Sequence, residues 1–292
     1  MIIKRILYFF EFTITFIIIF IFKFFPMNFV SLIGGRIFQS IGPFTKSHKT
    51  AISNINIVFP NLNKKEKEKI VYDSWNNLGK TFSEFIILDK ILNKKNNRIK
   101  ISGLDYLNEI KKKNEQVIFF GIHQSNWEIL VPTMDNLGIN VGAIYRHINN
   151  PHIDKLINKI RKKNIKNQKT FYTPKGKESA KAILSAVISG QSIILLIDQK
   201  DSAGNIINLF NHEVKTQIGF LKIAKKNNLK LVPIQNIRKK INNFELIFHQ
   251  PINPFENNDK NEIDVMNDIH KIIENWIIHF PKQWFWQHNR FS

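Results

Sequence analysis

The chain has 292 residues, of which 43% are hydrophobic, so it is long enough to bury a sizeable core in one large domain or two small ones. It contains no cysteine, which excludes disulfides and thiolate chemistry. Its formal net charge of +20 favours a polyanionic partner, which could be nucleic acid, an anionic membrane surface or an acidic protein.

The first predicted element is an apolar helix over residues 6–25, interrupted only by Glu11, Thr13, Thr15 and Lys23. Its length is close to the roughly 20 residues that a membrane helix needs. A spanning helix, a helix in the membrane interface and a cleaved signal peptide all remain open. More basic residues follow this segment than precede it, so the positive-inside rule predicts that the rest of the chain lies in the cytoplasm. We expect a membrane anchor at 1–25 and one catalytic domain at 26–292.

The elements that follow change character near residue 100. A second apolar helix is expected at 26–42, and an amphipathic helix at 63–88. Beyond residue 100, strand-like runs alternate with helical ones. The predicted strands are 117–122, 141–145, 192–197, 231–237 and 244–248, and the predicted helices are 127–137, 151–163, 178–189 and 217–227. This alternation predicts an α/β fold with a largely parallel sheet.

His123 and Glu128 form the most informative local pattern. They are five residues apart, a spacing that puts them on different faces of a continuous helix, so they can cooperate only if the backbone turns between them. Ser125 or Asn126 would make a good helix N-cap there. His123 would then end a strand and Glu128 would begin a helix, where sites in α/β sheets collect. A neutral imidazole oriented by a carboxylate is a competent general base, and the alternative is a histidine satisfied by a local hydrogen bond.

The absence of cysteine and of a Gly-x-Ser-x-Gly segment leaves no evident enzyme nucleophile. We therefore expect direct attack by a substrate hydroxyl that His123 deprotonates.

Two further strand ends carry polar residues. Arg146 follows the predicted strand 141–145, where it could hold a phosphate with two hydrogen bonds or be an ordinary surface arginine. Asp198 and Gln199 follow the strand-like run 192–197, and Asp198 could bind a substrate hydroxyl, fix Arg146 or simply form a turn. No metal site is predicted, because no cysteine or carboxylate cluster accompanies the chain's histidines.

Two segments are unusual in composition. Residues 155–177 contain nine Lys or Arg and no acid, and this tract could dock an acidic protein or anionic head groups, or be a solvated face. Residues 281–291 are dense in aromatics, which suits either a packed C-terminal lid or an interfacial belt.

Together and in this order, these motifs closely resemble the late acyltransferases of lipid A biosynthesis, the lauroyl/myristoyl transferases of Gram-negative inner membranes. The matching elements are His123 with Asn126, Trp127 and Glu128, then Arg146 between a tyrosine and an Asn-Pro pair, then Asp198 with Gln199, then the terminal aromatic segment.

The resemblance implies a glycerolipid-acyltransferase-like α/β fold, with a mixed sheet flanked by helices and an N-terminal membrane helix. It implies transfer of a fatty acyl chain from acyl carrier protein to a hydroxyl of a lipid A precursor, in lipopolysaccharide biosynthesis at the inner membrane. His123 would be the general base and Glu128 its partner, while Arg146, Asp198 and Gln199 would lie near the acceptor. No cofactor and no metal is implied. Acyl carrier protein is acidic, so the net charge of +20 would steer it to the enzyme.

Two rival functions stay open. One is an acyltransferase that acts on another glycolipid or on a lysophospholipid. The other is a membrane-tethered basic protein that recruits nucleic acid, which would explain the charge but not the ordered motifs. We expect no nucleic-acid partner.

Overall fold

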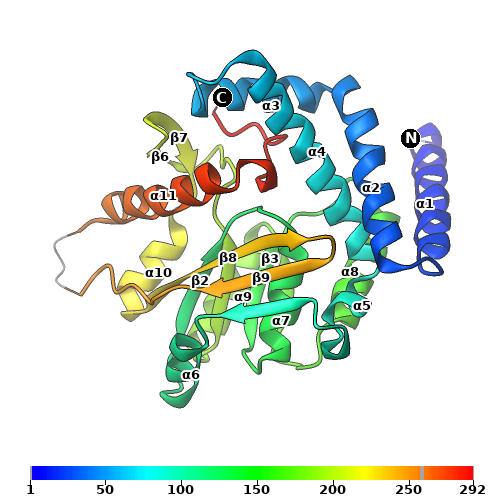
Figure 1. Cartoon of the computed structure of the whole chain (residues 1–292). Helices are drawn as coiled ribbons and strands as arrows, with labels where there is room; N and C mark the ends of the chain where they lie inside the picture. Colours follow the sequence, from blue (N-terminus) through cyan, green and yellow to red (C-terminus); the bar gives the residue numbers. More distant parts are fainter. Residues whose placement is uncertain (1, 257–259, 292) are drawn as a thin grey trace.

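The computed structural model describes residues 2–256 and 260–291 (Figure 1). Its first part is helical, with α1 (Ile2–Phe22), α2 (Met27–Ile41), α3 (Lys46–Val58), α4 (Lys64–Ile86) and α5 (Leu88–Leu92). The helix α4 begins with a capping box, in which Asn63 Oδ1 accepts from the Glu66 amide at 3.0 Å and Glu66 Oε2 accepts from the Asn63 amide at 2.9 Å. The helices expected at 26–42 and 63–88 are thus confirmed.

A seven-stranded sheet forms the centre of the molecule, in the order β1-β9-β8-β2-β5-β3-β4. Its strands are β1 (Ile99–Ser102), β2 (Val117–Gly121), β3 (Val141–Tyr145), β4 (Phe171–Pro174), β5 (Ser192–Leu196), β8 (Lys230–Lys240) and β9 (Asn243–Phe248). Neighbouring strands are parallel except for the antiparallel pair β8 and β9. The predicted mixed, largely parallel α/β sheet is confirmed.

Helices connect and cover these strands (Figure 1). They are α6 (Leu104–Lys112), α7 (Leu130–Asn136), α8 (Pro151–Lys163), α9 (Lys177–Ile188), α10 (Gly219–Asn227) and α11 (Glu262–His279). Four short 3-10 helices are present in the described chain: η1 (Gly42–Phe44), η2 (Lys94–Asn96), η3 (Trp127–Ile129) and η4 (Pro281–Gln283). A hairpin of β6 (Asn205–Leu209) and β7 (His212–Thr216) stands apart from the main sheet.

The central strand β2 is buried on both faces, as its unbroken apolar run requires. Ile118 and Phe120 pack in the cluster that includes Trp276 of α11, whereas Val117 and Phe119 pack in the cluster on the other face. Successive side chains of a strand point to opposite faces, so each face receives alternate residues. The residues just beyond β2 are therefore held at the edge of a rigid sheet that is packed on both faces.

The helix α1 differs from the other helices. It is the one helix among the described residues that is long and apolar enough to cross a membrane, over Ile3–Phe22, and only 6% of that stretch is buried in the protein. Length and composition alone are weak evidence for a span. The helix ends before residue 25, and the division into an anchor at 1–25 and a domain at 26–292 stays a prediction.

Candidate active site

His123 lies two residues beyond β2, and the backbone turns immediately after it. Ser125 has a left-handed backbone with φ of 56°, and its carbonyl accepts hydrogen bonds from the Thr81 hydroxyl at 2.7 Å and the Asn77 amide at 3.4 Å. Asn126 caps η3 by accepting from the Glu128 amide at 3.2 Å. The predicted turn between His123 and Glu128 is thus present, with Asn126 as the N-cap.

The imidazole of His123 is held by Asp198. His123 Nδ1 lies 2.7 Å from Asp198 Oδ1, and the His123 backbone amide donates to Asp198 Oδ2 at 3.0 Å. The side chain of Asp198 is only 3% exposed, while that of His123 is 16% exposed. The carboxylate thus anchors both the ring and the backbone of the histidine, and the ring keeps an exposed edge.

Asp198 is built to stay ionised. Burial raises the pKa of this carboxyl, but the charge of His123 and hydrogen bonds from its ring, from the Trp284 indole and from the His123 amide outweigh burial and lower the pKa below its usual value. Trp284 Nε1 donates to Asp198 Oδ2 at 2.8 Å. An ionised Asp198 accepts a hydrogen bond from the protonated Nδ1 of His123, which leaves the basic lone pair of the ring on Nε2.

The sheet register explains this pair. The strands β2 and β5 are parallel neighbours with Gly121 opposite Leu196. His123 and Asp198 each lie two residues past that pair, so the two side chains leave the same edge of the sheet side by side. Their position follows from the pairing of two strands that are far apart in sequence.

The pairing expected between His123 and Glu128 is wrong. Both carboxylate oxygens of Glu128 are bonded to Arg161 of α8, at 2.6 Å from Nη2 and 3.0 Å from Nε. Each of the two side chains is 15% exposed. The charge of Glu128 raises the pKa of Arg161 against the opposing effect of burial. The guanidinium also lies over the rings of Tyr145 and Tyr172, at 5.5 and 5.7 Å.

Glu128 therefore fastens α8 to the turn after His123, and Asp198 occupies the position that the sequence analysis gave to Glu128. Asp198 was expected near the acceptor or beside Arg146, and its observed partner is the histidine.

The rim of the site is aromatic and basic. The rings of Trp127 and Phe285 lie 5.2 and 6.2 Å from the His123 ring. Gln199 Nε2 lies 3.2 Å from His123 Nε2. Arg146 is exposed at the end of β3. Burial lowers the pKa of His288 to about 4, and nearby positive charges, Arg146 among them, add to that effect.

The structure thus brings Asp198, Gln199 and, at the rim, Arg146 to the edge where His123 lies.

The aromatic segment near the C-terminus packs into the protein, which favours the packed lid over the interfacial belt. Trp284 and Trp286 are 2% and 0% exposed. The Phe285 amide donates to the His123 carbonyl at 3.0 Å, and Gln124 bridges to Trp284. Trp284, which bonds Asp198, was not singled out by the sequence analysis, although the density of tryptophans in this segment was a usable signal.

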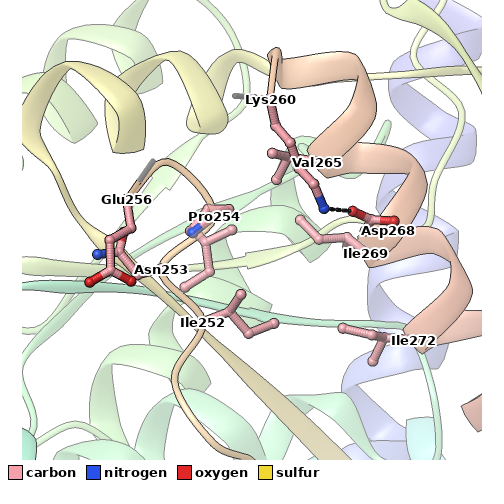
Figure 2. Close-up of a pocket in the computed structure, with 10 residues that line it drawn as sticks. Ile252, Asn253, Pro254, Glu256, Lys260, Val265, Asp268, Ile269 and Ile272 are labelled. Atoms are coloured by element: carbon pink, nitrogen blue, oxygen red, sulfur yellow. Dashed lines mark hydrogen bonds and ion pairs between the residues drawn. The ribbon is translucent and has the colours of Figure 1, made fainter. Parts of the chain in front are cut away.

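A cavity beside α11 is a separate feature. A cavity of about 280 Å³ is lined by Leu231, Ile252, Val265, Ile269 and Ile272, with the Lys260–Asp268 ion pair at its rim (Figure 2). Leu231 is paired with Ile118, near the amino end of β2. The cavity is therefore at the opposite edge of the sheet from His123 and is no part of this site.

No group of three or more His, Cys, Asp or Glu residues suited to a metal ion occurs within 2–256 and 260–291. The expectation that no metal is used stays a prediction.

A histidine held by a buried carboxylate at the carboxyl edge of a parallel sheet has the geometry that general-base chemistry requires. Comparison with known sequences gives the family. The chain matches the bacterial lipid A biosynthesis acyltransferase family over residues 4–292, and it belongs to that family.

Two curated relatives are also named as lipid A biosynthesis transferases. It is 23% identical over 277 residues to the lipid A biosynthesis palmitoleoyltransferase of Escherichia coli (strain K12), covering 91% of this chain and 86% of that protein. A lipid A biosynthesis acyltransferase of Shigella flexneri matches with the same identity and coverage. Among solved structures, the 1-acyl-sn-glycerophosphate acyltransferase of Thermotoga maritima matches with a TM-score of 0.40 and 12% identity, covering 86% of this chain and 96% of that one.

Proposed function

We propose that this protein transfers a fatty acyl chain from acyl carrier protein to a hydroxyl of a lipid A precursor, with His123 as the general base. The observation that carries the proposal is the 2.7 Å contact between His123 Nδ1 and Asp198 Oδ1 at the carboxyl edge of the sheet. Family membership supports the acyl transfer and the lipid A acceptor. The carrier-bound donor rests on the resemblance and on the net charge of +20, which suits an acidic partner.

The proposed reaction begins at His123 Nε2. This atom accepts the proton of the acceptor hydroxyl while the hydroxyl oxygen attacks the thioester carbonyl, and Asp198 stabilises the imidazolium that forms. The tetrahedral intermediate then collapses, the carbon–sulfur bond breaks, and the departing thiol of the carrier takes the proton back from His123. The histidine ends the cycle neutral, as it began.

The residues around the dyad have supporting roles in this proposal. The Gln199 amide, 3.2 Å from Nε2, is close enough to the reacting atoms to donate to the oxyanion. Trp127 and Phe285 give the imidazole an apolar wall that suits an acyl chain. Arg146, exposed at the end of β3, is free to bind a phosphate of the acceptor.

Glu128 has no part in the proton transfer in this scheme. Its bond to Arg161 makes it a positioning residue for the turn that carries His123.

The test is an acyl-transfer assay on membranes that contain the full chain, with acyl carrier proteins of several chain lengths and a lipid A precursor. His123→Ala should lower the rate by about 10²–10⁴-fold, which is the contribution typical of a general base. His279→Ala is the matched control, because His279 is exposed on α11 and bonds the Asn275 carbonyl.

Transfer that survives His123→Ala would contradict the mechanism. Wild-type protein that acylates a lysophospholipid but no lipid A precursor would support the rival acceptor instead.

A further inference from the structure

One face of α1 is turned toward the rest of the protein from Tyr8 to the end of the helix. The residues of α1 that recede from solvent are Tyr8, Phe12, Thr13, Thr15, Ile19 and Phe22, and all but Thr13 follow one another at spacings of three or four. Ile19 is 5% exposed, and Phe22 packs against the buried cluster that contains Val30 and Phe85. This spacing is that of a single helical stripe, so α1 lies along the protein from Tyr8 onward, whereas residues 3–7 are exposed.

Polar contacts tie the middle of α1 to the first turn of α8. Asn150, which is 3% exposed and caps α8, donates to the Tyr8 carbonyl at 2.8 Å and to Glu11 Oε2 at 3.0 Å. The rings of Phe12 and His152 are 5.6 Å apart. The one carboxylate of this apolar helix is therefore bonded to a residue of the catalytic domain.

The remaining surface of α1 is apolar and exposed. It includes Phe9, Phe10, Ile14, Ile17, Phe20 and Ile21, each between 45% and 60% exposed. Contiguous apolar surface of this kind marks an interaction site.

The adjoining side of α8 is basic. Lys155, Lys159 and Lys162 are exposed and follow His152 at helical spacings of three or four, so they share the side of α8 that meets α1. None of the three has an ion-pair partner within the described part of the chain.

We propose that α1 is an in-plane anchor that lies along one leaflet of an anionic bilayer. Its outer face enters the acyl region, while the three α8 lysines reach the headgroups. A spanning orientation would carry the first turns of α8 into the hydrocarbon together with the middle of α1, and buried lysines are costly there. The in-plane orientation keeps every contact with α8. Anionic lipid headgroups complement the charge of a row of exposed lysines that lies beside an apolar helix.

The role of this anchor in the reaction rests on the proposed function, in which the acceptor is a membrane lipid. Arg146 is four residues before Asn150, at the end of β3. An anchor that holds Asn150 at the bilayer surface also holds the rim of the site near that surface, where a lipid acceptor is found.

The topology can be mapped directly, since the chain has no cysteine. Single-cysteine variants Lys4→Cys and Lys23→Cys place one thiol near each end of α1, and Lys226→Cys on α10 is the control. We expect a membrane-impermeant maleimide to leave all three unlabelled in intact spheroplasts and to label all three after lysis. Labelling of either α1 position in intact spheroplasts would show that α1 spans and would overturn the proposal. This readout does not depend on acyl transfer, so it stands even if the proposed reaction fails.

The lysine stripe needs a separate measurement. The triple variant Lys155→Gln, Lys159→Gln, Lys162→Gln should bind phosphatidylglycerol-rich vesicles about 10–100-fold more weakly than wild type. The matched control replaces Lys222, Lys225 and Lys226 of α10, which lies on the far side of the molecule from α1 (Figure 1). Equal loss in both triple variants would overturn the assignment. Unchanged vesicle binding with a raised KM for acyl carrier protein would also overturn it and assign the stripe to the carrier.

Discussion

At the scale of single residues, a buried carboxylate holds the turn after His123 in place. Glu84 of α4 is 0% exposed and accepts hydrogen bonds from Ser31 Oγ at 2.6 Å and Asn126 Nδ2 at 3.0 Å. It also forms an ion pair with Arg238 of β8, whose side chain is 7% exposed. A buried charge pair of this kind persists only when its remaining polar atoms are satisfied, and here they join α2, β8 and the N-cap residue of η3.

Removing this carboxylate should be strongly destabilising. We expect Glu84→Ala to lower the free energy of unfolding by about 3–5 kcal/mol, because Arg238 is left as an unpaired buried charge. Glu68→Ala is the control, since Glu68 forms an exposed pair with Lys64 and should cost less than about 1 kcal/mol. Denaturant unfolding in detergent measures both, and similar losses in the two variants would contradict this role.

The Glu128–Arg161 pair makes a second prediction at this scale. Glu128→Ala should lower the free energy of unfolding by about 3 kcal/mol, because it leaves the mostly buried Arg161 without its carboxylate partner. Adding Arg161→Met should restore part of that loss. A double-mutant cycle on unfolding free energies gives the coupling. Strictly additive losses would show that the two side chains do not stabilise the fold as a pair.

The turn and the cap after His123 were predicted from the sequence, but the expected contact was with Glu128, whereas the structure places Asp198 beside the His123 ring. Glu128 is close to His123 in the chain, whereas Asp198 is brought there by the neighbouring positions of β2 and β5. A single sequence does not reveal which strands are neighbours. The contact between Asp198 and His123 therefore could not be predicted from the residues around either one, although the position of Asp198 at the end of a strand was predicted.

At the scale of elements, glycines let α2 and α4 approach closely. A Cβ on Gly79 of α4 would lie 2.2 Å from the Gly34 carbonyl oxygen of α2. A Cβ on Gly35 would instead meet the flexible side chain of Asn76 at 2.8 Å and the Asn76 carbonyl at 3.1 Å. The α2–α4 contact matters for the site, because α2 supplies Ser31 and α4 supplies Glu84.

Alanine at these glycines should have graded effects. Gly79→Ala forces two backbones apart and should cost about 1–3 kcal/mol of stability or more, because a packed interface cannot absorb the extra methyl group. Gly35→Ala should cost less, since a side chain can move. Thermal unfolding compares the two variants, and the reverse order would contradict the close approach.

Most elements with a strong local pattern were predicted, and α11 is the exception. The helices α8 and α10 and the strands β2, β3 and β9 have strong patterns. The strands β1 and β4 have four residues each, too few to show a period, and their pairing with β9 and β3 comes from the completed sheet. The helix α11 was missed although its signal is present, since Asn261 and Asp264 form a capping box before an apolar stripe.

At the scale of the whole molecule, one buried histidine couples the fold to pH. His270 of α11 is 0% exposed, and its Nδ1 lies 2.6 Å from the Asn208 carbonyl oxygen of β6. Burial lowers the pKa of His270 to about 4 from its usual 6.5. The folded state therefore binds the proton less readily than the unfolded state between these values.

Its contribution to stability is present above pH 6.5 and is lost as the pH falls from 6.5 toward 4. The expected slope is about 1.4 kcal/mol per pH unit for this one group. We predict that His270→Gln removes that part of the slope while other acid-sensitive groups keep theirs. Melting temperatures of wild type and variant across pH 4–7 measure the difference, and parallel curves would contradict the assignment.

We expect Asp198, and not Glu128, to be the carboxylate that supports His123 in the proposed acyl transfer. The most direct measurement compares the transfer rates of Asp198→Asn and of the double variant Glu128→Ala, Arg161→Met, in folded, membrane-bound protein. We predict a loss of about 10²–10⁴-fold for Asp198→Asn, because the imidazole loses the group that fixes its tautomer. The double variant should stay within about tenfold of wild type, since it leaves the dyad intact. A double variant as inactive as Asp198→Asn, or an Asp198→Asn variant of near wild-type rate, would contradict the claim.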